Sequence, residues 1–273
     1  MAAGSGTINA VTGDAAVNDA VVTNVGGINI SAANGDVDAA ALTSATSVAL
    51  SGQDIDLTGK TDATTTAMLT ATAGNISAVG ALDVEGSAVT LSGAALGGTG
   101  VTLTSTGGAI AANAVTATTG DVAVTATGGD VTLGDVVATT GAIAINAATG
   151  NIDVGATNAG TSITISGQDI DLTGKTDATT TAMLTATAGN ISAVGTLDIE
   201  GSAVTLSGAA LGGTGVTLTS TAGAIAAHAV TATTGDVAVT ATGGDVTLGA
   251  VGATTGAIDR KSTRLNSSHE PDA

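Results

Sequence analysis

The sequence predicts an all-β protein that folds as a parallel β-solenoid, with short strands stacked coil upon coil. Three observations predict this fold. The chain of 273 residues contains 41 glycines and no aromatic residue. Short apolar-x-apolar segments recur along it, and turn glycines recur at a fixed spacing. A fixed period of about 20 residues with short strands is typical of a stacked repeat protein.

The glycine spacing sets the length of one coil. Two series of turn glycines recur every 20 or 21 residues: Gly100, Gly120 and Gly141, and Gly108, Gly129 and Gly150. One unit therefore has about 20 residues and carries at least two short strands. About 258 residues at about 21 per coil give roughly 12 coils. At about 4.8 Å per stacked strand, the rod is expected to be about 60 Å long.

Alternation within each short strand predicts which side chains face inward. In Val131-Thr132-Leu133, the two aliphatic residues share one face and Thr132 points outward. The core is then a narrow column of Val, Ile, Leu and Ala, which explains the absence of aromatic residues. At the corners, pairs such as Gly120-Asp121 and Gly150-Asn151 are expected to tolerate tight or left-handed turns.

Two other folds could give short repeated segments. A helical protein is opposed by the abundance of Gly and Thr and by the period-two patterning. A β-propeller blade needs about 40 residues and four strands, so two coils could imitate one blade. The continuous period favours the solenoid.

A long internal duplication divides the repeat region, which we place at residues 1–258. Residues 51–143 reappear as residues 166–258, shifted by 115 positions, with six differences over 93 residues. The differences are Ala81/Thr196, Val84/Ile199, Gly107/Ala222, Asn113/His228, Asp135/Ala250 and Val137/Gly252. Such near identity indicates a recent duplication.

Composition and charge exclude several classes of function. The chain has 23 acidic and five basic residues, a net charge of −18. Such a surface repels nucleic-acid backbones and anionic membranes. The chain has no cysteine, so disulfide scaffolds and Cys-ligated metal sites are excluded. No apolar run is long enough to span a bilayer, and the first residues do not look like a secretory signal. We therefore expect either a cytoplasmic protein or an excerpt of a longer chain.

The repeat units resemble those of filamentous haemagglutinin-type bacterial adhesins and related β-strand-repeat surface proteins. The resemblance rests on GDVAVTATGGDVTLG (120–134), GAIAINAATGNIDVG (141–155) and TAGNISAVGALDVEGSAVTLSG (72–93), and it covers nearly all of residues 20–258. It implies a right-handed parallel β-helix that forms the stalk of a large secreted or cell-surface adhesin, exported through an outer-membrane partner. It also implies attachment to surface glycans, proteins or extracellular matrix, as in cell–cell, host or biofilm contacts. Neither a secretion domain nor a receptor-binding module is recognisable.

The last residues differ abruptly from the repeat. After Ile258 the chain reads Asp259-Arg260-Lys261 and onward in place of the repeat's Ala-Ile-Asn. This string resembles the conceptual translation of a sequencing adapter. We therefore interpret residues 259–273 as a non-native tail that does not belong to the repeat fold.

Few residues suggest chemistry. Asp54 and Asp56 flank Ile55, and the duplicate places Asp169 and Asp171 in the same way. Alternation puts each pair of carboxylates about 7 Å apart on one outer face. That geometry leaves two hypotheses open besides a solvated polar face. One is a calcium site, because hard cations bind clustered oxygens; the other is the carboxylate pair of an inverting glycosidase. Catalysis is not expected, because the chain lacks sugar-stacking aromatics and has almost no bases, and no other cofactor is expected.

Three further motifs favour structural roles. Gly59-Lys60-Thr61, repeated at residues 174–176, ends like a phosphate-binding loop, but Asp54 stands where that loop requires its first glycine. His228 is replaced by Asn113 in the sister copy, which argues against a catalytic base. Thr-x-Thr segments at 102–104, 116–118 and 125–127 raise an ice-binding hypothesis, because aligned threonines can form flat arrays. The alternatives to an adhesin stalk are therefore a polysaccharide-active enzyme and an ice-binding solenoid.

Overall fold

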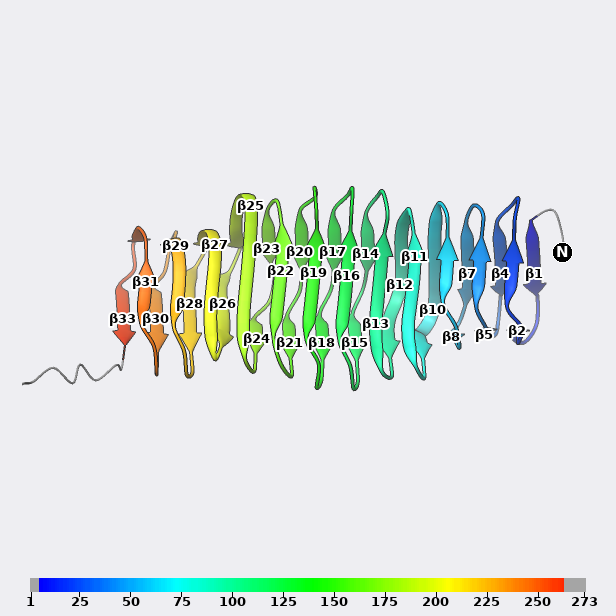
Figure 1. The fold of residues 1–273 in the computed structure, drawn as a ribbon, viewed down its shortest axis with the longest axis horizontal. Helices are drawn as coiled ribbons and strands as arrows, with labels where there is room; N and C mark the ends of the chain where they lie inside the picture. Colours follow the sequence, from blue (N-terminus) through cyan, green and yellow to red (C-terminus); the bar gives the residue numbers. More distant parts are fainter. Residues whose placement is uncertain (1–4, 263–273) are drawn as a thin grey trace, which may run out of the picture.

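The structure, a computed structural model, describes residues 5–262 and confirms an all-β parallel solenoid of about 12 turns. Thirty-three strands form a rod, and every strand pairing in the described residues is parallel (Figure 1). Each full turn has three sides, and strands on the same side hydrogen-bond to those of the next turn. We call the three resulting stacks column I, column II and column III. Five long strands turn a corner and therefore contribute to two columns each.

The strand bounds follow from these columns. Column I contains β1 (Gly6–Ala10), β4 (Ile28–Ala32), β7 (Val48–Gly52), the first halves of β10 (Thr66–Ala78) and β12 (Ala88–Gly97), β14 (Ile110–Ala112), β17 (Val131–Leu133), β20 (Ile152–Val154), β23 (Ile170–Leu172), the second halves of β25 (Thr181–Ala193), β27 (Ala203–Gly212) and β29 (Ile225–Ala232), and β32 (Val251–Ala253). Column II contains β2 (Ala15–Val17), β5 (Val37–Ala39), β8 (Ile55–Leu57), the second halves of β10 and β12, β15 (Val115–Ala117), β18 (Val136–Ala138), β21 (Thr157–Ala159), β24 (Thr176–Ala178), β26 (Thr196–Gly201), β28 (Gly215–Ser220), β30 (Val237–Ala241) and β33 (Ile258–Ser262). Column III contains β3 (Val21–Thr23), β6 (Leu42–Ser44), β9 (Thr61–Ala63), β11 (Ala81–Gly86), β13 (Gly100–Ser105), β16 (Val122–Ala126), β19 (Ile143–Ala147), β22 (Ile163–Gly167), the first halves of β25, β27 and β29, and β31 (Val246–Leu248).

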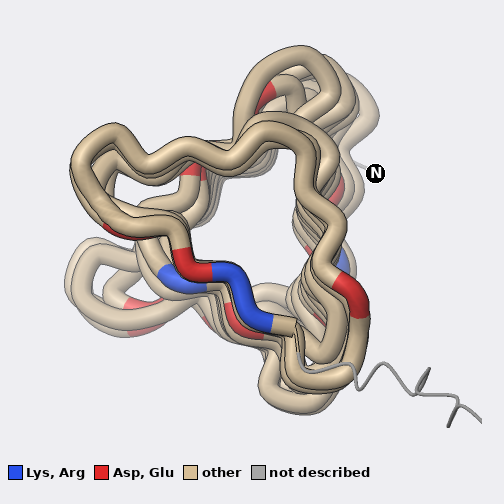
Figure 2. Tube along the Cα trace, turned by 90° about the vertical axis from the view of Figure 1, so that its left-hand side faces the viewer, with Lys and Arg blue, Asp and Glu red and all other residues tan. Residues whose placement is uncertain are grey.

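Viewed along the rod axis, successive coils stack on one another around a common centre, and their corner loops project to different extents (Figure 2). Paired residues in successive turns are usually 21 positions apart, with extremes of 18 between Ile152 and Ile170 and 23 between Thr61 and Val84. The predicted alternation is confirmed: Val131 is fully buried and Leu133 nearly so, while Thr132 is exposed. Because strands stack in register, like residues form continuous ladders in the core. In column III the ladder runs through Val101, Val122, Ile143 and Ile163.

The reason for the corner glycines differs from our expectation. Among the described residues, only Gly13, Gly93 and Gly208 have a positive φ, so Gly120 and Gly150 do not make left-handed turns. They are required because the backbones of successive turns approach closely at the corners. A Cβ on Gly120 would lie 1.7 Å from the carbonyl oxygen of Thr99, and one on Gly150 would lie 2.2 Å from that of Gly129. Any side chain there would push the coils apart.

The duplicated blocks occupy different columns. The segment 66–71 lies in the fourth turn of column I, whereas its copy at 181–186 lies in the ninth turn of column III. The shift of 115 residues thus equals five whole turns plus two-thirds of a turn. Identical sequences therefore face different sides of the rod, and matched residues acquire different neighbours.

The chain end continues the strand pairing beyond the repeat sequence. β33 runs to Ser262 in register with β30, so Arg260 is aligned with the buried Val239. Arg260 remains exposed at this inward position, and its Nη2 donates to the Val246 carbonyl at 2.5 Å. The interpretation of residues 259–273 as non-native stays a prediction, and residues 263–273 lie outside the described part of the chain.

Thr61 and its copy in the duplicated block have different neighbours in the core. Thr61 is fully buried above Leu42 in column III, and its Oγ1 has no hydrogen-bond partner. Its copy, Thr176, lies above Thr157 in column II and accepts a hydrogen bond from that hydroxyl at 3.1 Å. Burying a hydroxyl without a partner costs about 1–3 kcal/mol.

We expect Thr61→Val to raise the free energy of unfolding by about 1 kcal/mol, because it removes an unsatisfied hydroxyl at nearly constant volume. Thr176→Val should lower it by a similar amount, because it leaves the Thr157 hydroxyl without its acceptor. Urea unfolding of both variants checks this, and equal effects from the two substitutions would contradict the assigned register.

Candidate functional site

The predicted carboxylate pair at Asp54 and Asp56 lies at the start of β8, on the outer side of column II. The half-buried Asp54 carboxylate accepts the backbone N–H of Asn75, one turn on, at 2.6 Å. The exposed Asp56 carboxylate accepts the hydroxyl of Ser77 from the same next turn. Both side chains are therefore engaged in bonding one coil to the next.

The second pair repeats this arrangement on another side of the rod. Asp169 accepts the Asn190 N–H at 2.8 Å, and Asp171 accepts the Ser192 hydroxyl. This pair lies on column I because the duplication is out of phase by part of a turn. The four predicted residues are thus two separate pairs, and the structure does not bring them together.

Sequence reasoning missed a ladder of corner residues to which Asp54 belongs. The carboxylate of Asp14 accepts the N–H of Asp36 at 3.0 Å, Asp36 accepts that of Asp54 at 3.1 Å, and Asp54 accepts that of Asn75. We call this the corner ladder. A second corner ladder runs through Asp130, Asn151, Asp169 and Asn190, with distances of 2.8, 3.2 and 2.8 Å. The signal in the sequence is an Asp or Asn that recurs about once per coil, just before an inward-facing aliphatic residue.

One stretch of column II gathers like charges. Asp38 and Asp56 lie directly opposite each other on β5 and β8, next to the corner ladder of Asp14 and Asp36. Burial raises the pKa of Asp38 above its ordinary value, and the neighbouring Asp56, Asp14 and Asp36 charges raise it further. Folding therefore favours the protonated form of Asp38.

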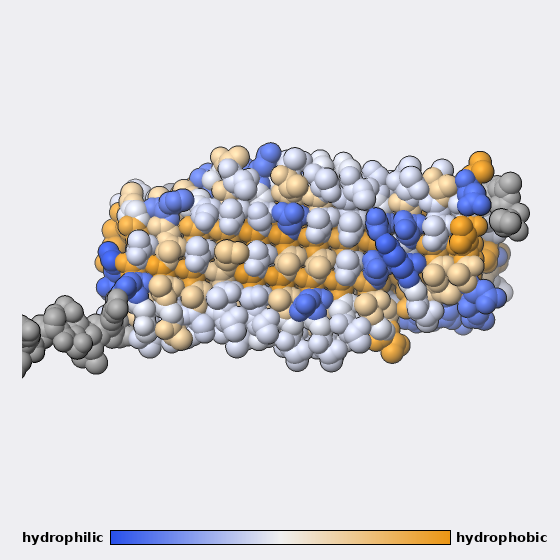
Figure 3. All heavy atoms as spheres, viewed as in Figure 1, coloured by the Kyte–Doolittle hydropathy of each residue, from blue (hydrophilic) through white to orange (hydrophobic). Residues whose placement is uncertain are grey.

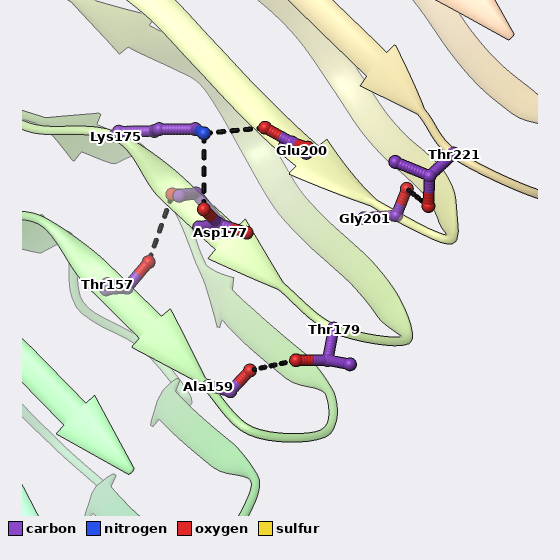
Figure 4. A network of polar contacts seen from close by, with 9 residues as sticks. Thr157, Ala159, Lys175, Asp177, Thr179, Glu200, Gly201 and Thr221 are labelled. Atoms are coloured by element: carbon purple, nitrogen blue, oxygen red, sulfur yellow. Dashed lines mark hydrogen bonds and ion pairs between the residues drawn. The ribbon is translucent and has the colours of Figure 1, made fainter. Parts of the chain in front are cut away.

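Lys60 and Lys175 belong to the two motifs that resemble the end of a phosphate-binding loop. Each lies within a group of carboxylates. Lys60 Nζ contacts Glu85 at 2.5 Å and Asp62 at 3.9 Å. Its copy Lys175 contacts Glu200 at 2.6 Å and Asp177 at 3.2 Å (Figure 4). Lys60 and Lys175 already have anionic neighbours, which would repel a phosphate.

The pKa values in these groups are shifted. The hydrogen bond to Glu85 raises the pKa of Lys60, and the bond to Glu200 raises that of Lys175. Burial raises the pKa of Asp83 and of its copy Asp198, although the nearby lysine opposes this shift. The ion pairs are about 40% exposed on the lysine side, so they contribute little to stability.

The remaining candidates lie apart from these groups. His228 is exposed, and its Nδ1 accepts the Gly208 N–H at 3.3 Å, so it caps the neighbouring turn. Thr102, Thr104 and Thr125 share the outer side of column III, whereas Thr116 lies on column II. The threonine segments do not form one array.

The described part of the chain contains no pocket and no group of three or more His, Cys, Asp or Glu residues that could hold a metal ion. Within residues 5–262 there is also no helix long and apolar enough to cross a bilayer. The calcium and glycosidase hypotheses for Asp54, Asp56, Asp169 and Asp171 remain predictions. The observed role of these side chains is to bond successive coils.

Comparison with known proteins adds no further assignment. No protein-family model, no curated protein and no solved structure matches the chain. The repeat geometry and the use of its side chains therefore carry the functional argument.

The corner ladder predicts a specific requirement at Asp54. We expect Asp54→Ala to lower the free energy of unfolding by about 0.5–1.5 kcal/mol, because the Asn75 N–H loses its acceptor. Asp54→Asn should be much closer to wild type, since Asn151 Oδ1 makes the equivalent bond to Asp169 in the second ladder. Thermal unfolding of both variants checks this; calcium titration in the same assay tests the cation hypothesis separately.

The like-charge contact at Asp38 predicts a pH effect. Because the folded-state pKa of Asp38 is raised, its charged form destabilises the fold at neutral pH, and this destabilisation is relieved as the pH falls through the folded pKa. Asp38→Asn should therefore stabilise the protein by a few tenths of a kcal/mol at pH 7. The gain should shrink towards pH 4. A gain that is constant between pH 4 and pH 7 would show that charge is not its cause.

Proposed function

We propose that this chain is a stalk segment of a secreted or cell-surface bacterial adhesin of the filamentous haemagglutinin type, with no catalytic activity. The proposal draws on the resemblance of the repeat units together with the rod geometry. The observation that carries it is the uninterrupted stacking of three parallel columns along the whole described chain. A continuous hydrogen-bonded stack gives a stiff spacer that keeps its two ends apart.

The use of the side chains supports a mechanical role. Aliphatic residues fill the core, corner glycines allow close backbone contact, and the corner ladders bond each coil to the next. The carboxylates that would form a glycosidase pair are bonded to the adjacent coil, on two different sides of the rod. Attachment in such a protein would be distributed over many coils rather than concentrated at one site.

The duplication offers a clean test of the spacer role. Deleting residues 51–165 joins Leu50 to Ser166, and Ser166 begins the copy of the segment that it replaces. Because the removed length is five and two-thirds turns, the rod should shorten by about 27 Å at about 4.8 Å per turn. We expect the shortened chain to fold, with its melting curve preserved in shape. Small-angle X-ray scattering measures the maximum dimension of both chains.

The adhesive role needs a separate measurement. Beads coated with the full chain should bind bacterial or host cells or extracellular matrix, and the 51–165 deletion should reduce binding in proportion to the lost coils. Single exposed substitutions, such as Thr132→Ser, should barely change it. Absence of binding to every surface would leave a passive spacer and refute adhesion by this segment. Loss of all binding on one substitution would reveal a discrete site and contradict distributed attachment.

A further inference from the structure

The corner between β4 and β5 holds the only Asn-Gly step in the chain, Asn34-Gly35. Asn34 is exposed, and its Nδ2 donates a hydrogen bond to the carbonyl oxygen of Val11, one coil earlier, at 3.1 Å. The residue before it also bonds to that coil, because the Ala33 N–H donates to the Ala10 carbonyl at 3.0 Å. Asn34 therefore helps to link the second coil to the first.

The stacking of the coils requires glycine after Asn34. A Cβ on Gly35 would lie 2.3 Å from the carbonyl oxygen of Gly13, so a side chain does not fit there. Glycine leaves its backbone nitrogen without a side chain to shield it. The Gly35 N–H also donates no hydrogen bond to another residue of the described chain. The contact that selects glycine thus leaves an unshielded and unbonded nitrogen directly after Asn34.

We propose that Asn34 is a site of spontaneous covalent modification, where loss of the side-chain amide weakens the link between the first and second coils. The Gly35 nitrogen gives its proton to hydroxide and forms a bond to Asn34 Cγ, and Nδ2 leaves as ammonia, taking a proton from water. Water then opens the succinimide ring at either carbonyl and leaves an aspartate or an isoaspartate at position 34. In balance, an amide and a water become a carboxylic acid and ammonia. The inference rests on this corner and does not depend on adhesion.

Folding slows this reaction without blocking it. Gly35 is buried against the first coil, so hydroxide reaches its nitrogen only when the corner opens. Opening breaks the Asn34 bond to Val11. It also breaks the 3.0 Å bond from the Asp36 N–H to the Asp14 carboxylate, but no strand pairing, because the corner lies between β4 and β5. Such local opening costs less than global unfolding, so modification is expected in the folded rod, at a lower rate than in the unfolded chain.

Both products weaken the contact between the coils. An aspartate carboxylate has no hydrogen to donate, so two acceptors face each other where Asn34 now bonds to Val11. It also adds negative charge near Asp14, whose Oδ1 lies 2.6 Å from the place that a Cβ of Gly35 would take. Strongly polar side chains already gather towards the N-terminal end of the face shown in Figure 3. Isoaspartate in addition lengthens the main chain by a methylene at a corner that has no room for a Cβ.

The other asparagines serve as controls within the same chain, because each is followed by a residue with a side chain. Asn151 belongs to the second corner ladder and precedes Ile152, whose N–H donates to the Asp169 carbonyl at 2.9 Å. Attack by that nitrogen would meet a β-branched side chain and would break a bond to the next coil. Asn151 should therefore keep its amide under conditions in which Asn34 reacts.

A second corner provides a matched variant without the amide. Thr149 lies at the corner between β19 and β20, and its Oγ1 donates to the Thr127 carbonyl at 3.3 Å. This bond to the preceding coil corresponds to the one that Asn34 makes with Val11. Gly150 follows Thr149 in an equally close contact with the preceding coil. Asn34→Thr should therefore fold with the link between the coils intact and with no amide to lose.

The experiment follows the folded wild-type chain and Asn34→Thr during incubation at pH 6 and pH 9, with the wild-type chain in urea as the unfolded reference. Trypsin releases the peptide that ends at Lys60, and tandem mass spectrometry locates each amide-to-acid mass gain in it. We expect aspartate and isoaspartate at position 34, formed faster at pH 9 because hydroxide removes the proton. Asn34→Thr should show no gain at this position, and Asn151, in the next peptide, should stay unchanged.

Hydrogen exchange tests the effect on the coils. The amide hydrogens of Ala33 and Asp36, both bonded to the first coil, should lose protection in proportion to the modified fraction. Asn34→Thr, incubated in the same way, should keep this protection. Freshly prepared Asn34→Asp should show part of the loss at once, because it lacks the donor but has a normal main chain.

Three results would overturn the proposal. Modification in urea but not in the folded chain would show that the rod does not permit the reaction. Equal modification at Asn34 and Asn151 would show that the corner does not select the site. Unchanged exchange at Ala33 and Asp36 in the modified chain would refute the weakened link. None of these results would alter the length of the rod in scattering, so failure here is distinguishable from failure of the spacer role.

Discussion

The backbone contact between successive coils is the constraint on which the rest of the structure depends. Strands in one column hydrogen-bond to each other, so every turn must present the same three sides in the same register. That requirement selects aliphatic residues at inward positions and glycine at corners such as Gly120, where the Thr99 carbonyl leaves no room for a Cβ. It also limits the size of the core, and this narrow space is filled without any aromatic residue.

The same constraint gives the acidic residues a structural meaning. At a corner the chain leaves one column before entering the next, and an N–H there needs an acceptor outside the strand pairing. An Asp or Asn one turn away provides it, as Asp130 does for Asn151. Much of the negative charge thus follows from how the corners are bonded. Next to the corner ladder, the outward carboxylates of Asp38 and Asp56 lie side by side, so like charges repel each other there.

Sequence alone predicted the fold class, the coil length and the inward residues, because period and alternation are local properties of the chain. Val131 and Leu133 could be assigned to the core from three letters. The number of sides per turn could not be predicted, since short strands separated by similar turns do not reveal which strand pairs with which. The corner ladder and the Lys60–Glu85 contact were missed for the same reason: their partners are 21 to 25 residues apart, and the exact offset varies from turn to turn. The pairing of Asp54 with Asp56 on one side was predicted, but its use in bonding the next coil needed the register.

The duplicated blocks lie in different columns, so the register between coils allows the same sequence on more than one side of the rod. A block that begins in column I can be repeated from column III only if the three sides are nearly equivalent in inward residues and in coil spacing. Thr61 and Thr176 mark the limit of that equivalence, because the same buried hydroxyl finds a partner in one column and none in the other. Outward residues are not bound by the constraint, so rotation of the copy distributes identical surface groups around the rod.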